Sequence, residues 1–187
     1  MTGNLTKFNT IRYLYKKIMS LNGITNILII MINDTYLERD YQEYKEISVF
    51  AEPESVMRFQ CSQRLQKLLG LSYFKKGSKL FAVVAEDRIV AYTWLHTNYD
   101  PNGDIDRIGI KNYHIAGQTF VEIGHRGKRL SGKLKNRICK YAKENSRFPI
   151  YTVNSFDNIP IIKNNLSEHY KLKNVVIKLK KTNPLVL

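Results

Sequence analysis

The junction at residues 120–134 constrains the fold of this chain more than any other feature. An apolar, β-rich run from Tyr113 to Ile123 passes through Gly124-His125-Arg126-Gly127-Lys128 into a helical pattern. A helix that begins at such a turn presents unpaired amide groups and the positive end of its macrodipole, which suit a phosphate or pyrophosphate. The junction therefore indicates an anion site. From these residues alone, a solvated basic helix after an ordinary turn explains the pattern equally well.

Positive charge gathers around the same junction. Residues 101–187 carry 17 Lys and Arg against 6 Asp and Glu, whereas residues 1–100 carry 13 and 10. Between residues 126 and 147 there are nine basic side chains, and Glu144 is the one acidic residue. The surplus predicts that the second half of the chain meets an anionic partner. Nucleic acid, an anionic membrane surface and a phosphorylated small molecule all fit it.

Length and composition predict a single domain over residues 1–187. This is the size of one domain, and 43% hydrophobic residues provide enough bulk for a core, which excludes a disordered chain. Cys61 and Cys139 show no metal-ligand spacing, so we expect reduced thiols and no metal. The chain shows no secretory signal pattern and no apolar run near the roughly 18 residues that span a bilayer, so we expect a soluble, cytoplasmic protein.

Hydrophobic periodicity predicts alternating helices and strands. Residues 8–21 form a basic amphipathic pattern, which fits a helix packed on its own domain or one that docks on a membrane surface or a partner. The other expected elements are strands at 24–31, 80–85, 89–96, 113–123, 149–153 and 175–180, and helices at 53–69, 130–142 and from 158 onward. The strands at 80–85 and 89–96 are expected to form a hairpin, and residues 100–104 a plain loop.

The helix that begins at residue 130 has two different sides. Its apolar residues recur at helical spacing along one face. Basic residues are expected on the remaining circumference, and these are Lys133, Lys135, Arg137, Lys140 and Lys143.

Residues 126–132 resemble the phosphate-binding motif of the GNAT superfamily of acyl-CoA-dependent acyltransferases, Q/R-x-x-G-x-G/A. The matching run is Arg126-Gly127-Lys128-Arg129-Leu130-Ser131-Gly132. It departs from the motif at two positions, because Arg129 stands where the family prefers Gly and Ser131 where it prefers Gly or Ala. The resemblance thus implies either that the Arg129 side chain points outward or that the loop is reshaped.

Further landmarks follow in the family's order over residues 80–180. The hairpin is similar to the second and third strands of the family, and Val121 precedes Arg126 by five residues, as in its fourth strand. Asn158-Ile159-Pro160 resembles its Asn-x-Pro helix start, and Tyr170 stands where a Phe is expected. The resemblance implies an α/β (α+β) fold with a GNAT-like mixed, mostly antiparallel central sheet and helices on both faces.

The resemblance also implies how acetyl-CoA, or another acyl-CoA, is held. The backbone of the 113–123 strand would pair with the pantetheine arm as an added strand does, and the amides of the turn would carry the pyrophosphate. The cofactor-binding residues implied in this way are Phe120, Val121, Ile123, Arg126, Gly127, Lys128, Arg129, Leu130, Ser131 and Asn158.

The implied reaction is direct attack of an amine on the thioester. An ammonium with a pKa near about 10.4 must first lose a proton, so a base or a water chain is needed. His114 is the first candidate because imidazole titrates near neutrality, and Glu122 is the alternative. A structural role is the competing interpretation of both. The family's Tyr that protonates the leaving thiolate corresponds to Asn165, so that proton must come from another group, such as Tyr151, Ser155, His169 or water.

Three functions fit these observations. The first is an N-acetyltransferase that acts on an amine of a small molecule or sugar nucleotide, and an anionic acceptor suits the basic chain. The second is a non-catalytic acyl-CoA or RNA-binding module on the same scaffold, although basic residues interleaved with an aromatic platform are lacking. The third is transfer of a longer acyl chain at a membrane surface, which the first helix permits.

Overall fold

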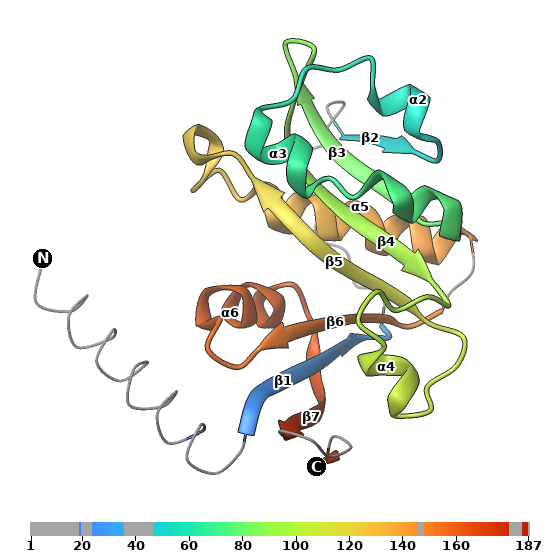
Figure 1. Ribbon diagram of the computed structural model, residues 1–187, viewed down its shortest axis with the longest axis vertical. Coiled ribbons are helices and arrows are strands. Elements are labelled where there is room, and N and C mark those ends of the chain that lie inside the picture. Colours follow the sequence, from blue (N-terminus) through green and yellow to red (C-terminus); the bar gives the residue numbers. More distant parts are fainter. Residues whose placement is uncertain (1–18, 20–23, 36–46, 146–147, 180–184, 187) are drawn as a thin grey trace, which may run out of the picture.

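The computed structural model describes residues 19, 24–35, 47–145, 148–179 and 185–186 (Figure 1). The basic helix predicted at 8–21 lies outside this part of the chain, except for Met19. No helix in the described ranges is both long and apolar enough to cross a bilayer.

A single mixed sheet forms the centre of the molecule. Its eight strands follow the order β2-β3-β4-β5-β6-β1-β7-β8. All neighbours are antiparallel except β5 and β6, which run parallel, so the predicted mixed, mostly antiparallel sheet is confirmed. The strands are β1 (Ile24–Asn33), β2 (Ile47–Phe50), β3 (Lys79–Ala85), β4 (Arg88–Thr97), β5 (His114–Val121), β6 (Ile150–Ser155), β7 (Lys171–Leu179) and β8 (Leu185–Val186).

Helices cover both faces of the sheet, as the strand alternation dictates. On one face Ala91 and Leu95 of β4 pack against α5 (Leu130–Asn145), and α6 (Ile159–Ser167) lies on this side too. On the other face Tyr92 and Trp94 pack against the segment that contains α3 (Gln63–Leu68) and η1 (Leu71–Lys76). The remaining helical segments on this second face are α2 (Pro53–Val56) and α4 (Asp104–Arg107).

The first strand, β1, lies inside the sheet between β6 and β7, although it comes from the N-terminal end of the described chain (Figure 1). Leu28 and Ile30 pack on the α4 face, whereas Ile29 and Met31 pack on the α5 face. A strand buried on both faces needs apolar residues at every position, which explains the unbroken run that predicted it.

Two sequence predictions need correction. The single helix predicted at 53–69 is wrong, because α2 and α3 are separate. Between them Gln60 pairs with the hairpin turn: its amide donates to the carbonyl of Asp87, and its carbonyl accepts from the amide of Ile89. The expected plain loop at 100–104 is also incomplete, since α4 begins at its end.

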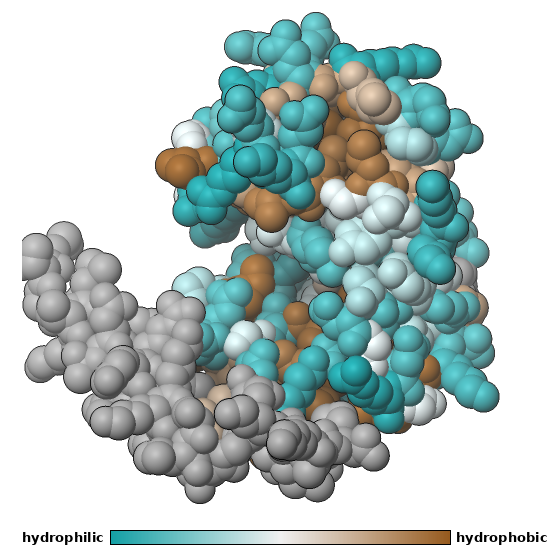
Figure 2. All heavy atoms as spheres, in the orientation of Figure 1, coloured by the Kyte–Doolittle hydropathy of each residue, from teal (hydrophilic) through white to brown (hydrophobic). Residues whose placement is uncertain are grey.

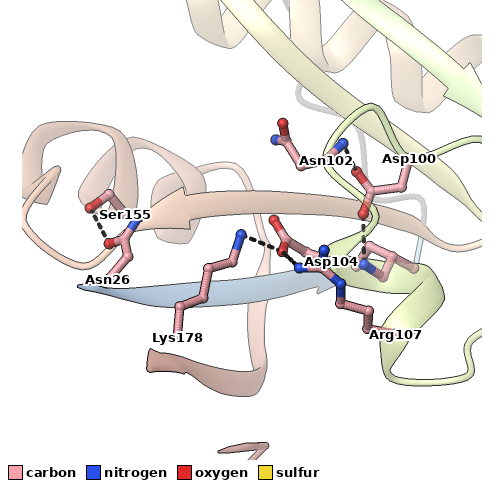
Figure 3. Close-up of polar contacts among 8 residues, drawn as sticks. Asn26, Asp100, Asn102, Asp104, Arg107, Ser155 and Lys178 are labelled. Atoms are coloured by element: carbon pink, nitrogen blue, oxygen red, sulfur yellow. Dashed lines mark hydrogen bonds and ion pairs between the residues drawn. The ribbon is translucent and has the colours of Figure 1, made fainter. Parts of the chain in front are cut away.

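Buried carboxylates hold α4 in place (Figure 3). Asp100 accepts a hydrogen bond from the amide of Ile105 at 2.6 Å. The carboxylate of Asp104, which is 2% exposed, forms an ion pair with Lys178 of β7 at 2.6 Å. Both acids therefore anchor α4 over the β1–β7 half of the sheet.

The α5 face can be tested by truncating Leu134, which is fully buried between α5 and the sheet. Leu134→Ala should lower the free energy of unfolding by about 2–5 kcal/mol, because it removes buried methyl groups and leaves a cavity. Urea denaturation measures the change. Leu166→Ala is the matched control on α6, where the side chain is 55% exposed, and it should cost less than about 0.5 kcal/mol. Equal losses in the two variants would contradict this packing.

Candidate functional site

The two parallel strands β5 and β6 separate almost as soon as they meet. They pair at His114↔Ile150 and Ile115↔Tyr151 only, and no later pair joins them in the described chain. Beyond Tyr151 one edge of each strand is left open, and Figure 1 shows the strands diverging toward α6 and the end of β5. Figure 2 shows the surface hollowed at this level. An extended ligand arm can add to such an open edge through backbone hydrogen bonds.

A β-bulge in β5 accompanies this separation. Tyr92 pairs with Phe120 but Trp94 pairs with Gly117, so β5 carries one extra residue between them. The bulge contains Gln118, whose φ of 46° is left-handed. Its side-chain oxygen accepts from Nε2 of the buried His96 at 2.8 Å. Nothing in the sequence pattern indicated this bulge, because glutamine is not a typical residue for a positive φ.

Strand alternation decides which backbone groups of β5 face the opening. The amide of Glu122 donates to the carbonyl of Val90 on β4, so the peptide groups of Val121 point the other way, toward β6. The same alternation turns Phe120 toward β4, and Ile123 lies in the short helix η2 (Ile123–His125). Of the three predicted backbone partners, Val121 therefore faces the opening. Its carbonyl accepts from Nε of Arg126 at 3.3 Å.

The turn after β5 has the backbone of an anion cradle. Gly127 has a φ of 81°, and a Cβ placed there would meet no atom within 4 Å, so the space above the turn is open. Lys133 is the first α5 residue in the described chain whose amide bonds back, to the carbonyl of Arg129 at 3.1 Å. The preceding amides of α5 are thus free to bind an anion.

Arg129 adopts a backbone conformation that favours glycine. Its φ is 56°, in the left-handed region, and its side chain is exposed. The turn therefore keeps the backbone that a glycine permits, and the side chain points outward, which was one of the two alternatives predicted from the sequence. Gly127 and Arg129 thus place two left-handed residues within three positions of the turn.

The helix α6 lies against this turn. Asn164 donates from Nδ2 to Oγ of Ser131 at 3.2 Å, so α6 contacts the start of α5 directly. Asn158 is the exposed N-terminal cap residue of α6. The side chain of Leu130 is buried in the core, so only its amide can serve a ligand.

The two predicted bases lie at opposite ends of β5. His114 is 2% exposed, its Nδ1 lies 2.9 Å from Oγ1 of Thr97, and burial lowers its pKa to about 4. Glu122 follows the strand and accepts a hydrogen bond from Ser62, the N-cap of α3. Eight residues at about 3.3 Å each separate them by roughly 25 Å, so they cannot act on the same amine.

A buried polar cluster behind the opening was missed from the sequence. Lys135 was predicted on the solvent side of α5, which is wrong, because it is 2% exposed and donates to Oδ1 of Asn165 on α6. Burial lowers the pKa of Lys135 to about 8. Asn165 is fully buried and donates from Nδ2 to Oγ1 of Thr152 on β6 at 3.0 Å. The helical pattern could not identify this lysine, since its partners come from other elements.

No group of three or more His, Cys, Asp or Glu side chains in the described ranges is arranged to hold a metal ion.

Comparison with solved structures identifies the fold. A GNAT-family protein from Novosphingobium aromaticivorans superposes with a TM-score of 0.59 at 14% identity, over 81% of this chain and 63% of that one. A GNAT-family acetyltransferase from Colwellia psychrerythraea gives 0.55 at 14% identity, over 89% and 62%. A tandem GNAT protein from the clavulanic acid biosynthesis pathway gives 0.52 at 15% identity, over 88% and 58%.

The chain therefore has the GNAT fold. It spans 58–63% of the length of these three structures. No protein-family model matches the sequence, and the comparison with curated proteins gives no match. At these identities the likeness establishes the fold alone, and activity must be argued from the site.

The left-handed conformation of Arg129 gives a test of the turn. Arg129→Val should lower the free energy of unfolding by about 1–2 kcal/mol, because a β-branched residue is disfavoured at positive φ, whereas Arg129→Gly should not lower it. Thermal and urea unfolding measure both. Lys128→Val, an exposed neighbour without a positive φ, is the control and should change stability by less than about 0.5 kcal/mol. Equal losses at residues 128 and 129 would exclude this turn geometry.

Buried His114 gives a test in pH. Its pKa falls from 6.5 to about 4 on folding, so the unfolded chain binds a proton that the folded chain does not between these values. The contribution of neutral His114 to the free energy of unfolding is complete above pH 6.5 and is lost as the pH falls toward 4. The loss is about 3 kcal/mol, at about 1.4 kcal/mol per pKa unit. Urea unfolding at pH 7 and pH 4 should show a smaller loss for His114→Asn than for the wild type, and an identical loss would refute the burial of a neutral imidazole.

Proposed function

We propose that the protein is an acyl-CoA-dependent N-acyltransferase, most simply one that transfers acetyl from acetyl-CoA to an amine of a small molecule or sugar nucleotide. The observation that carries the proposal is the open edge of β5 beside a turn with free amides at the start of α5. This combination can pair with an extended amide-containing arm and bind a diphosphate at the arm's end. The GNAT fold supports it at the level of the superfamily.

The turn supplies the diphosphate site in this proposal. Free amides between Gly127 and Ser131 would donate to the phosphate oxygens, and the exposed side chains of Lys128 and Arg129 add positive charge beside them. Arg126 has a different place, because its Nε is bonded to the carbonyl of Val121 and so closes the end of the β5 edge. The hydroxyl oxygen of Ser131 accepts a hydrogen bond from Asn164, so the diphosphate site is in direct contact with α6.

The open edge of β5 supplies the site for the pantetheine arm. The outward-facing amide of Val121, whose carbonyl is occupied by Arg126, would donate to a carbonyl of the arm, and Asn158 at the start of α6 would border the arm from the other helix. Acyl-CoA contributes a thioester whose carbonyl carbon an amine can attack. The protein contributes proximity at the point where β5 and β6 meet.

Neither predicted base is placed to take the amine proton directly. His114 is buried near that meeting point and hydrogen-bonded to Thr97, and a base with a pKa of about 4 accepts protons weakly at neutral pH. Glu122 lies beside the turn, where its carboxylate is held by Ser62. Because it lies about 25 Å from His114, Glu122 is too far from the meeting point of β5 and β6 to act there, and we assign removal of the amine proton to solvent water that enters the opening. An anionic acceptor suits the basic surface.

A non-catalytic acyl-CoA binding module is the second candidate, and one observation favours it. Asn165 on α6 is buried and bonded to Lys135, and an amide is not a proton donor at neutral pH. Consumption of thioester with pooled amine acceptors separates the two functions. Turnover establishes the enzyme, whereas saturable acyl-CoA binding without turnover establishes the module.

Charge reversal at the turn tests the proposed cofactor site. Lys128→Glu should weaken acetyl-CoA binding by about 10-fold or more, because it replaces a charge-assisted contact to phosphate by repulsion. Isothermal titration calorimetry measures the affinity, and wild-type protein should gain about 2.7 kcal/mol of stability at 100 times the dissociation constant.

Lys143→Glu provides the matched control for this measurement. It makes the same charge change at an exposed site near the other end of α5. Its affinity should stay within about 2-fold of wild type at moderate salt, since screening weakens charges more than about 10 Å away. An equal effect of the two variants, or no binding by the wild type, would rule out the turn as the phosphate site.

A further inference from the structure

The buried cluster behind the opening fixes the direction of every hydrogen bond in it. An ammonium group can only donate, so the contact between Lys135 and Asn165 makes Oδ1 of Asn165 the acceptor. The other amide atom, Nδ2, then faces Thr152 and donates to its Oγ1 at 3.0 Å. Lys135 thus sets the orientation of Asn165, which could otherwise rotate to exchange its two ends.

Thr152 receives a second hydrogen bond from the same strand. Nδ2 of Asn154 donates to Oγ1 of Thr152 at 3.2 Å. With the Asn154 amide in this orientation, both lone-pair positions of Oγ1 accept from N–H groups, and the hydroxyl proton points to a third group. The described residues place no acceptor within hydrogen-bond distance of that proton. Thr152 therefore has a hydroxyl group prepared to donate.

The position of Thr152 indicates what the hydroxyl serves. The last residue pair between β5 and β6 is Ile115↔Tyr151, so Thr152 is the first β6 residue beyond the closed end of the opening. Its side chain lies on the face that carries α5 and α6, where Asn165 contacts it. The six residue steps of β5 from Val121 to Ile115, at about 3.3 Å each, put this point roughly 20 Å from the turn, and an extended arm bound along β5 would run toward it.

We propose, on the basis of the proposed acyl transfer, that Thr152 is a catalytic residue whose hydroxyl donates a hydrogen bond to the sulfur of the leaving thiolate, and that Asn165 and Lys135 are its positioning residues. In this step the amine nitrogen forms a bond to the carbonyl carbon, and the carbon–sulfur bond breaks with its electron pair on sulfur. The proton lost by the amine passes to solvent water, so the products are the amide, the thiolate and one solvent proton. The Thr152 proton is shared with sulfur and is not transferred.

Removal of the hydroxyl tests this role. Thr152→Val should lower kcat by about 10-fold or more while the dissociation constant for CoA changes by less than about 3-fold, because a hydrogen bond to a charged group is lost only when charge is on sulfur. Thr152→Ser keeps the hydroxyl and should retain most of kcat. The pKa of the thiol in bound CoA, read from thiolate ultraviolet absorbance, should rise by about one unit in Thr152→Val and not in Thr152→Ser.

Lys135→Met tests the positioning residues independently of any change at Thr152. The variant removes the donor that orients Asn165, so kcat and the pKa of the bound thiol should shift in the same direction as in Thr152→Val. In wild type, kcat should fall as the pH rises through the pKa of Lys135, which is about 8. This decrease of kcat at alkaline pH should be absent from the pH profile of Lys135→Met. The groups that face Lys135 are Glu168, Cys139 and the Tyr170 ring, of which the carboxylate of Glu168 stabilises the charged form.

The outcomes separate this inference from the function on which it rests. Wild-type protein that binds no acyl-CoA overturns the proposed function. Wild-type protein that binds and turns over acyl-CoA, together with a folded Thr152→Val variant of unchanged kcat and unchanged thiol pKa, overturns only the role of Thr152. If Thr152→Val does not fold, an unchanged thiol pKa in folded Lys135→Met overturns the positioning role and with it the hydrogen-bond chain that prepares Thr152.

Discussion

The separation of β5 from β6 is the constraint on which the rest of the structure depends. Each unpaired backbone group that stays buried costs about 1–3 kcal/mol, so two adjacent strands that part must be held apart by other contacts. The bulge at Gln118 supplies one, since Nε2 of His96 donates to its side chain and the hydroxyl of Ser78 in turn donates to Nδ1. These bonds lie on the α3 face, and they fix β5 without using the edge that faces β6.

Local patterns predicted the elements whose contacts are local. The hairpin of β3 and β4, the helix α5 and the turn before it follow from periodicity and from glycine and charge placement within about 20 residues. The break between α2 and α3 did not, because Gln60 leaves the helix to pair with the distant hairpin turn at Asp87 and Ile89. A backbone pairing of this kind interrupts the helix, and the hydrophobic pattern of the sequence does not show it.

In the candidate site, too, local features were predictable from the sequence and features set by distant contacts were not. The turn at Gly127 was predictable, because free amides and positive charge are properties of a helix start. The side of β5 that each peptide group faces was not, since the Glu122–Val90 bond decides it. The burial of Lys135 was equally hidden, because its acceptor comes from α6 and the face of α5 toward α6 is set by packing. Sequence patterns predicted the turn with its free amides and positive charge but not the polar cluster behind it.

Stability does not explain why Lys135 is buried. A lysine in this position loses hydration, and replacing buried charges by packed apolar groups often leaves stability unchanged or raises it. What an apolar residue cannot supply is direction: only a donor to Oδ1 forces Nδ2 of Asn165 toward Thr152. The cluster spans α5, α6 and β6, the elements that surround the closed end of the opening. In the proposed acyl transfer, this fixed direction would present the hydroxyl proton of Thr152 to the reacting sulfur.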